Sequence, residues 1–239
     1  MKVNRIVFTG GGTLGHVMPN IPLIKHYQQA GWEVYYIGSK AGVERQKIEA
    51  LGVQYHGIRT GKLRRYFDWQ NFLDILNVLV AILQAVNLML RIRPNILFSK
   101  GGYVALPPVI GAGLLRIPVV IHESDMTPGL TTKLSKPFAK RICTAFQDTL
   151  RYFPKSKAVY TGLPVRKLVF SASREAGLAY TGFSGSRPIL LVFGGSLGAQ
   201  FLNNICTEQL NKAPFNGFDI VHICGKGNLS SVNGPHYIQ

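Results

Sequence analysis

The chain has 239 residues, 46% of them apolar, which is enough for a substantial core and predicts a globular protein of one large domain or two ordinary ones. Its formal net charge of +16, from 27 Lys and Arg against 11 Asp and Glu, favours anionic partners such as nucleic acid, phosphorylated substrates or an anionic membrane surface. The three cysteines lack the spacing of a disulfide framework or a zinc site, and the first apolar run is too short for a signal peptide, so we expect a protein of the reducing cytoplasm.

The first 162 residues alternate short apolar runs with stretches of helical periodicity. We expect strands near residues 5–9, 33–37, 53–58, 95–98, 118–121, 141–144 and 158–161. This alternation predicts an α/β fold with a Rossmann-like parallel sheet covered by helices on both faces. Ligands of such sheets bind beyond the carboxyl ends of the strands.

Residues 69–90 form the most apolar helical segment, but we do not expect it to span a membrane, because four polar residues interrupt it. At 100° per residue Asp74, Asn77, Gln84 and Asn87 fall within an arc of about 140°, which leaves a wide apolar face. Five basic residues flank the segment: Lys62, Arg64, Arg65, Arg91 and Arg93. We predict that part of the apolar face packs on the sheet and that the rest contacts an anionic membrane surface.

From residue 164 the sequence becomes irregular and rich in Gly and Ser, and residues 188–193, 198–212 and 218–223 then read as strand, helix and strand. One such βαβ unit has too few strands to bury both faces of a sheet. We therefore expect an N-terminal domain over 1–163, a linker over 164–187, and over 188–239 the beginning of a second Rossmann-like domain. On this interpretation the chain is a truncated part of a longer enzyme.

Three glycine turns each follow a predicted strand, at residues 10–15, 101–102 and 194–198. A glycine turn between a strand and a helix lets bare backbone approach a ligand, and it directs free helix N–H groups toward an anion. Three such turns predict a substrate rich in phosphate.

The first turn also matches the dinucleotide fingerprint Gly-x-Gly-x-x-Gly. An NAD enzyme would have an acidic residue at the end of the second strand, where this chain has Lys40, so an NADP enzyme remains an alternative. A nucleoside triphosphatase is disfavoured because the loop lacks Gly-Lys-Ser/Thr. A nucleic-acid binder would explain the charge, but no recognised motif or series of stacking aromatic residues accompanies it, so we expect no nucleic-acid partner.

His16 closes the first turn, at what should be the first turn of a helix, and an imidazole there can accept a proton near neutral pH. It is our candidate for the catalytic base or for a group that positions the acceptor; a histidine that only bonds the backbone is the alternative. Glu123 is the second candidate base. No Asp-x-Asp occurs, and the consecutive residues 122–125 cannot all face one ion, so we expect no metal site.

Five motifs in order, at residues 10–19, 100–104, 122–125, 162–166 and 194–200, resemble the MurG family of peptidoglycan N-acetylglucosaminyltransferases, and the resemblance runs through all 239 residues. It implies a two-domain GT-B glycosyltransferase without a cofactor. Such an enzyme transfers N-acetylglucosamine from UDP-N-acetylglucosamine, with inversion, to the muramyl 4-hydroxyl of undecaprenyl-pyrophosphate-linked muramyl pentapeptide, which converts lipid I to lipid II.

The resemblance also implies roles for individual residues. UDP-N-acetylglucosamine would contact Thr13, Leu14, Gly15, Asp125, Arg166 and Ser196. The acceptor would contact Gly11, Gly12, Gly101, Gly102, Tyr103 and Glu123, and the diphosphate of UDP would lie on Gly194, Gly195 and Gly198. Many members of the family have glycine in place of Leu14 and asparagine in place of Asp125, so the first turn is expected to be tighter and the sugar contact altered.

In this family the uridine pocket lies beyond position 239, so we expect this chain to bind the donor poorly. A non-catalytic fragment that binds the acceptor lipid or a partner at the membrane is the alternative interpretation. The resemblance further implies a peripheral protein on the cytoplasmic face of the cell membrane, with cell-wall synthesis proteins as partners and a role in cell shape and division.

Overall fold

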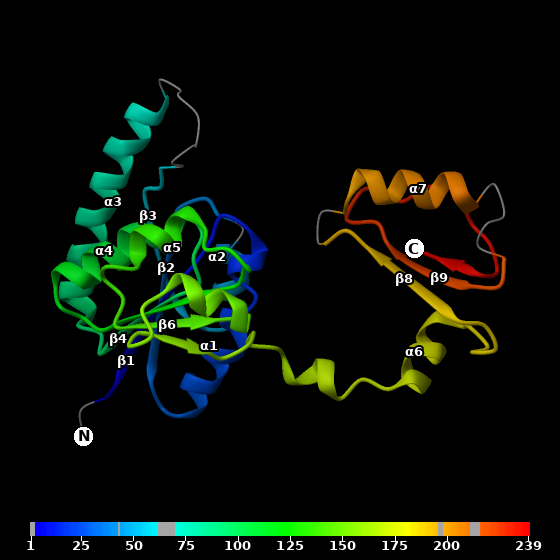
Figure 1. Ribbon diagram of the computed structural model, residues 1–239, viewed down its shortest axis with the longest axis horizontal. Coiled ribbons are helices and arrows are strands. Elements are labelled where there is room, and N and C mark those ends of the chain that lie inside the picture. The colour runs from blue at the N-terminus through cyan, green and yellow to red at the C-terminus, as the bar shows by residue number, and fades with distance from the viewer. Residues whose placement is uncertain (1–2, 43, 62–69, 196–197, 211–215) are drawn as a thin grey trace. The chain divides into compact units, whose positions relative to one another are not determined.

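The computed structural model describes residues 3–42, 44–61, 70–195, 198–210 and 216–239. The chain divides into two compact units, Met1–Lys167 and Leu168–Gln239, and each has its own parallel sheet (Figure 1).

The first unit is built on a sheet of seven parallel strands in the order β3-β2-β1-β4-β5-β6-β7. The strands are β1 Arg5–Thr9, β2 Glu33–Ser39, β3 Gln54–Ile58, β4 Ile96–Ser99, β5 Val119–Glu123, β6 Arg141–Thr144 and β7 Ala158–Tyr160. The predicted α/β fold and its seven strands are therefore confirmed, each strand to within two residues at either end.

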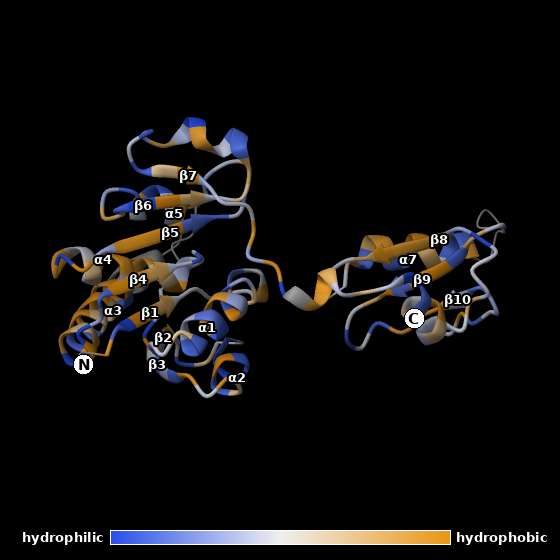
Figure 2. Ribbon diagram, turned by 90° about the horizontal axis from the view of Figure 1, so that it is seen from below, coloured by the Kyte–Doolittle hydropathy of each residue, from blue (hydrophilic) through white to orange (hydrophobic). Residues whose placement is uncertain are grey.

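Helices cover both faces of this sheet. They are α1 Asn20–Gln29, α2 Glu44–Glu49, α3 Gln70–Ile92, α4 Leu106–Leu114 and α5 Leu130–Ser135, with 3-10 turns η1 Leu14–His16, η2 Tyr103–Ala105 and η3 Gln147–Tyr152. In β1, Val7 faces α3 and α4, whereas its neighbours Ile6 and Phe8 face α1 and α2. Because both faces are buried, the central strands are mostly apolar, as Figure 2 shows for β4 and for the first part of β5.

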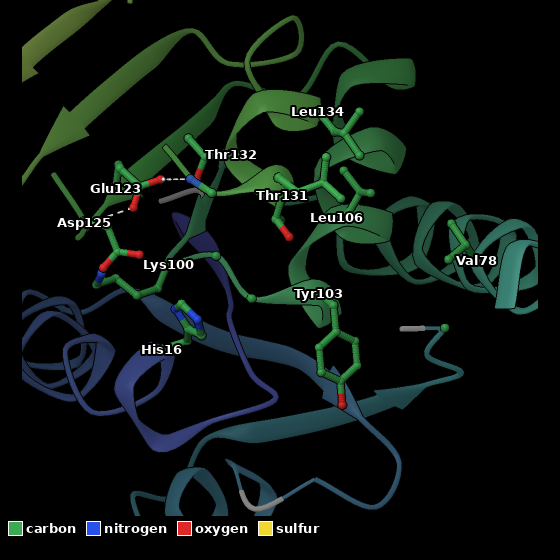
Figure 3. A pocket seen from close by; sticks show the side chains of 15 residues that line it. His16, Val78, Lys100, Tyr103, Leu106, Glu123, Asp125, Thr131, Thr132 and Leu134 are labelled. Carbon is green, nitrogen blue, oxygen red and sulfur yellow. Dashed lines mark hydrogen bonds between the residues drawn. The ribbon is translucent and has the colours of Figure 1, made fainter. Parts of the chain in front are cut away.

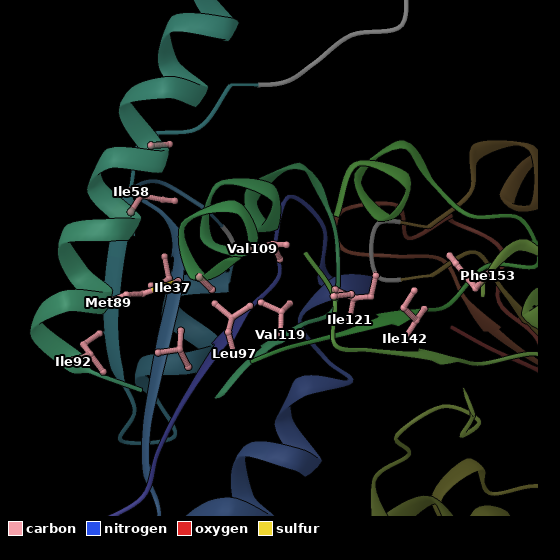
Figure 4. Close-up of a cluster of buried hydrophobic side chains, with 14 residues drawn as sticks. Ile37, Ile58, Met89, Ile92, Leu97, Val109, Val119, Ile121, Ile142 and Phe153 are labelled. Carbon is pink, nitrogen blue, oxygen red and sulfur yellow. The ribbon is translucent and has the colours of Figure 1, made fainter. Parts of the chain in front are cut away.

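Helix α3 has two apolar faces. On one, Ala81, Ala85 and Met89 recur every fourth residue and are buried; Ala81 and Met89 belong to the cluster shown in Figure 4. On the opposite face Leu76, Leu79, Leu83 and Leu90 are exposed, Leu83 to 69%. These four residues are called the leucine stripe below.

The predicted helix over 69–90 is confirmed from Gln70 onward, while Trp69, Lys62, Arg64 and Arg65 lie outside the described residues. Among the helices of the part that the structure describes, none is long and apolar enough to cross a membrane.

The second unit contains helices α6 Arg174–Thr181 and α7 Gln200–Leu210, and strands β8 Ile189–Phe193, β9 Asp219–Ile223 and β10 Tyr237–Ile238 in the order β10-β9-β8. The interpretation of residues 164–187 as irregular was wrong, because they include α6 and the 3-10 turn η4 Lys167–Phe170. The Ser173 side chain accepts a hydrogen bond from Ala176 N and begins α6, and Gly182 in the left-handed region ends it. Strand β10, two residues long, was not predicted.

One face of the second sheet is apolar and exposed. The alternate residues Ile189, Leu191 and Phe193 of β8 all point away from the interior of this unit. The unit holds together partly through a buried network, in which the His222 ring nitrogens lie 2.8 Å from the Tyr237 hydroxyl and 3.0 Å from Asn203 Oδ1.

The two faces of α3 predict opposite responses to truncation at adjacent positions. Met89→Ala should cost about 2–5 kcal/mol of the free energy of unfolding, because it leaves a cavity in the core. Leu90→Ala should cost less than about 1 kcal/mol, because that side chain is exposed. Both tryptophans, Trp32 and Trp69, belong to the first unit, so urea unfolding followed by tryptophan fluorescence reports on that unit alone. Equal losses in the two variants would contradict the packing of α3.

Candidate active site

The order of the strands brings the first two glycine turns together. Strands β1 and β4 are neighbours, paired from Ile6 and Ile96 to Thr9 and Ser99, and the chain proceeds from them toward opposite edges of the sheet. This is the topological switch point, where open α/β sheets bind their ligands. The turns at residues 10–15 and 100–102 therefore follow the carboxyl ends of two adjacent strands and lie side by side. The sequence predicted that both turns lie at this end of the sheet, but not that their strands are neighbours.

The two turns touch through bare backbone. Gly102 has φ +79°, and a Cβ built on it would overlap the carbonyl oxygen of Gly11. Gly12 has φ +86°, and a Cβ there would overlap the ring of Tyr103. Only glycine allows this combination of left-handed backbone and close approach.

A buried hydrogen-bond chain anchors the first turn from below. The Tyr36 hydroxyl in β2 donates to the carbonyl oxygen of Gly10 over 2.7 Å, and it accepts from Asn20 Nδ2 over 3.2 Å. The expected position of His16 in the first turn of a helix was wrong. His16 ends the 3-10 turn η1, and the turn residues 17–19 separate it from α1, which begins at Asn20.

A cavity of about 190 Å³ opens at this edge of the first unit (Figure 3). Its ionisable side chains are His16, Lys100, Tyr103, Glu123 and Asp125. The apolar part of its wall consists of Val78 from α3, Leu106 from α4, and Leu130 and Leu134 from α5. The cavity thus offers polar groups on one side and an apolar surface that reaches α3 on the other.

Six of the predicted site residues line this cavity: His16, Gly101, Gly102, Tyr103, Glu123 and Asp125. Gly11 and Gly12 lie behind it, against the second turn. Thr13 and Gly15 are exposed, Leu14 is partly exposed, and Arg166 is exposed in the segment after β7; none of these four lines the cavity. Gly194, Gly195 and Gly198 belong to the second unit, and Ser196 lies outside the described residues, so their roles stay predictions.

Residues 122–125 are the last two residues of β5 and the two that follow it, and their side chains make different contacts. His122 Nε2 lies 2.8 Å from the Gly162 carbonyl oxygen. Glu123 accepts a backbone N–H on each carboxylate oxygen, from Asp125 at 2.9 Å and from Gly129 at 3.1 Å. Glu123 therefore shapes the loop that presents Asp125. Among the described residues no group of three or more His, Cys, Asp and Glu side chains is placed to hold a metal ion.

The environment of His16 favours its neutral imidazole. Burial lowers its pKa and so does the charge of Lys100, while a backbone hydrogen bond at Lys100 and the carboxylates of Asp125 and Glu123 act in the opposite direction. Its Nδ1 atom is buried and has no hydrogen-bond partner among the described residues. An uncharged imidazole carries one unprotonated ring nitrogen, which can accept a proton at neutral pH.

Lys100 is a functional candidate that the sequence reasoning missed. Its side chain is only 1% exposed, and its ammonium donates a hydrogen bond to Ser124 Oγ. Burial lowers its pKa to about 8, against the opposing effect of Glu123 and Asp125. The signal was present in the sequence, since a lysine that directly follows an apolar strand and precedes a glycine pair must lie at the ligand edge of the sheet.

Comparison with known proteins places this geometry in context. Residues 6–144 match the model of the glycosyltransferase family 28 N-terminal domain. The chain is similar to a Clostridium tetani protein named UDP-N-acetylglucosamine–N-acetylmuramyl-(pentapeptide) pyrophosphoryl-undecaprenol N-acetylglucosamine transferase. The two sequences are 50% identical over 237 aligned residues, and the alignment covers 98% of this chain and 66% of that protein. A protein of the same name from Lachnoclostridium phytofermentans is 48% identical, over 99% of this chain and 67% of its own length.

Among solved structures, the crystal structure of Acinetobacter baumannii MurG matches with a TM-score of 0.69 and 28% identity, over 94% of this chain and 59% of that one. The chain thus spans about two thirds of the length of the curated relatives that it matches.

The contact between the glycine turns predicts that Gly102→Ala is strongly destabilising. A left-handed alanine alone costs roughly 1–2 kcal/mol, and at this position its Cβ would also overlap the Gly11 carbonyl. Gly52→Ala is the matched control, because Gly52 has φ +70° but nothing within 4 Å of a built Cβ. We expect Gly102→Ala to lose clearly more free energy of unfolding than Gly52→Ala in the fluorescence experiment described above; similar losses would argue against the contact.

Proposed function

This chain belongs to glycosyltransferase family 28, and on that premise we propose that it carries the acceptor site of an inverting N-acetylglucosaminyltransferase. The donor is UDP-N-acetylglucosamine, and the acceptor is the muramyl 4-hydroxyl of undecaprenyl-pyrophosphate-linked muramyl pentapeptide. The observation that carries the proposal is the cavity at the switch point, where His16, Asp125 and the second glycine turn meet. The chain that forms this cavity is 50% identical to a protein named as such an N-acetylglucosamine transferase.

His16 is the proposed base. The acceptor hydroxyl oxygen attacks C1 of the donor sugar, its proton passes to the neutral imidazole, and the bond between C1 and the UDP oxygen breaks with its electron pair leaving on UDP. Glu123 is less suited, because both its oxygens already accept backbone N–H groups. Backbone amides of the glycine turns, together with Arg166, would stabilise the departing diphosphate.

The charges of the cavity suggest how the two ends of the acceptor are arranged. Glu123 and Asp125 repel phosphate but accept hydrogen bonds from sugar hydroxyls. We therefore place sugar next to these carboxylates and the acceptor pyrophosphate on the backbone of the first two glycine turns. The apolar wall from Val78 to Leu134 leads to α3 and suits the first part of a lipid chain.

The second unit is proposed to contribute to donor binding. Its glycine turn with Gly194, Gly195 and Gly198 lies between β8 and α7, the position at which such a turn faces a phosphate. The exposed apolar face of β8 supports the view that residues 188–239 begin a larger domain, connected through residues 164–187. The alternative proposal is that this chain alone only binds the acceptor lipid or a partner.

The leucine stripe of α3 is the proposed membrane contact, on an anionic cytoplasmic leaflet. Four exposed leucines follow one face of the helix, Arg91 and Arg93 follow at its end, and the chain carries a net charge of +16. Because Val78 of the same helix lines the cavity, this placement brings a membrane-bound acceptor to the site. Cell-wall synthesis proteins are proposed as further partners.

Replacement of His16 tests the chemistry. In this sequence joined to the C-terminal third of the Clostridium tetani relative, His16→Ala should lower turnover by on the order of a hundredfold or more, the scale of general-base loss. The matched control is His26→Ala, an exposed histidine of α1, which should leave turnover unchanged. The measurement is release of UDP with a lipid-linked acceptor. Near-normal turnover of His16→Ala would remove His16 from the chemistry.

Sedimentation with liposomes tests the membrane contact. The chain should bind vesicles that contain anionic lipid at low salt, and Leu83→Ser should weaken binding by about tenfold or more, because insertion of one leucine is worth roughly 1.5–3 kcal/mol. Leu163→Ser, an exposed leucine outside α3, is the control and should have no effect. Absence of binding at low salt, or equal losses in both variants, would exclude the leucine stripe.

A further inference from the structure

We infer that Lys100 is a positioning residue of this cavity, whose buried ammonium holds the neighbouring His16 imidazole in its uncharged form. The meaning of this role for catalysis rests on the proposed function, whereas the coupling between the two side chains is a property of the folded chain alone.

The backbone ties the two residues together. Lys100 directly follows β4 and begins the second glycine turn, whose bare backbone lies against the His16 ring. A Cβ at Gly101 would be 3.8 Å from His16 Nδ1, and one at Gly102 would be 3.0 Å from Cδ2. The Lys100 side chain turns inward rather than to solvent and lies between His16 and Asp125 (Figure 3). The turn that begins with Lys100 therefore packs directly against the imidazole, and at Gly102 it leaves no room for a side chain.

The charged and titratable groups around His16 come from three elements. Lys100 comes from the turn after β4, Glu123 and Asp125 from the end of β5, and Tyr103 from η2. Among the described residues that line the cavity, Lys100 is the one side chain that adds a positive charge beside the imidazole. The pKa of His122 is lowered in the same way, first by burial and then by the charge of Lys100.

The order of the two pKa values makes this coupling effective. Lys100, at about 8, stays charged throughout the range in which His16 titrates, because the pKa of His16 lies below its ordinary value. Protonation of His16 would place a second cation in a small cavity next to a buried ammonium. The imidazole thus stays neutral to a lower pH than it would without the lysine. On the proposed function, this extends the range over which the base is available toward acid.

The experiment measures the pKa of His16 in the purified chain by NMR, from the pH dependence of its ring Cε1 resonance, which is assigned by its loss in His16→Gln. Lys100→Met, a side chain of similar length without charge, should raise this pKa by about half a unit or more. Lys140→Met, an exposed lysine, is the matched control and should leave it unchanged. An unchanged pKa in Lys100→Met overturns the inference.

A variant of opposite sign separates electrostatics from disturbed packing. Asp125→Asn removes a carboxylate that raises the pKa of His16, so it should lower that pKa, and Lys100→Met/Asp125→Asn should return it toward the original value. Shifts in the same direction in both single variants would indicate altered solvent access and would overturn the inference. Should Lys100→Met fail to fold, Lys100→Gln, which keeps a polar group near Ser124, is the second uncharged variant, with the same two outcomes.

Kinetics then distinguish this inference from the proposed function. The kinetic experiment uses this sequence joined to the C-terminal third of the Clostridium tetani relative. If His16 is the base, Lys100→Met should shift the acid limb of the pH profile of kcat/KM to higher pH, by as many pH units as it raises the pKa of His16 measured by NMR. A shift by NMR without a kinetic shift would uphold the coupling and reject His16 as the base. No shift by NMR would reject the coupling itself, whatever the kinetics show.

Discussion

The close approach of two glycine turns at the switch point of the sheet is the constraint on which the site depends. Because β1 and β4 are paired up to Thr9 and Ser99, the chain segments that follow them cannot diverge before they meet. The Gly102 backbone lies against the Gly11 carbonyl, and the same turn presses on the His16 ring. This contact places the imidazole and the start of the Lys100 turn next to each other at the cavity.

Charge inside the cavity is arranged as a small, mutually dependent set. The Glu123 carboxylate is held by backbone amides, so the loop that carries Asp125 has a fixed shape. Lys100 is buried, and its ammonium donates a hydrogen bond to Ser124, the residue between Glu123 and Asp125 in the sequence. The protonation state of His16 therefore depends on the charges of Lys100, Asp125 and Glu123 as well as on the imidazole itself.

Helix α3 of the first unit is buried in the core on one side and exposes apolar side chains on the other. Ala81, Ala85 and Met89 bury one side of α3 in the core, while the leucine stripe leaves the opposite side apolar and exposed. Val78 of the same helix lines the wall of the cavity. The exposed side chains of β8 in the second unit have a different cause, since a sheet of three strands there has an apolar face without a covering helix in the described part of the chain.

The sequence alone determined the seven strands of the first sheet and placed the first two glycine turns at the carboxyl ends of its strands, because apolar periodicity and glycine turns are local signals. It indicated His16, Tyr103, Glu123 and Asp125, which do line one cavity. It missed α6, whose irregular surroundings concealed a capped helix, and the short β10, whose stability comes from pairing with β9. Only the tertiary structure decided that Lys100 is buried and that Glu123 is occupied by backbone amides. Both depend on contacts between segments more than twenty residues apart or on the path of a loop, which no local pattern records.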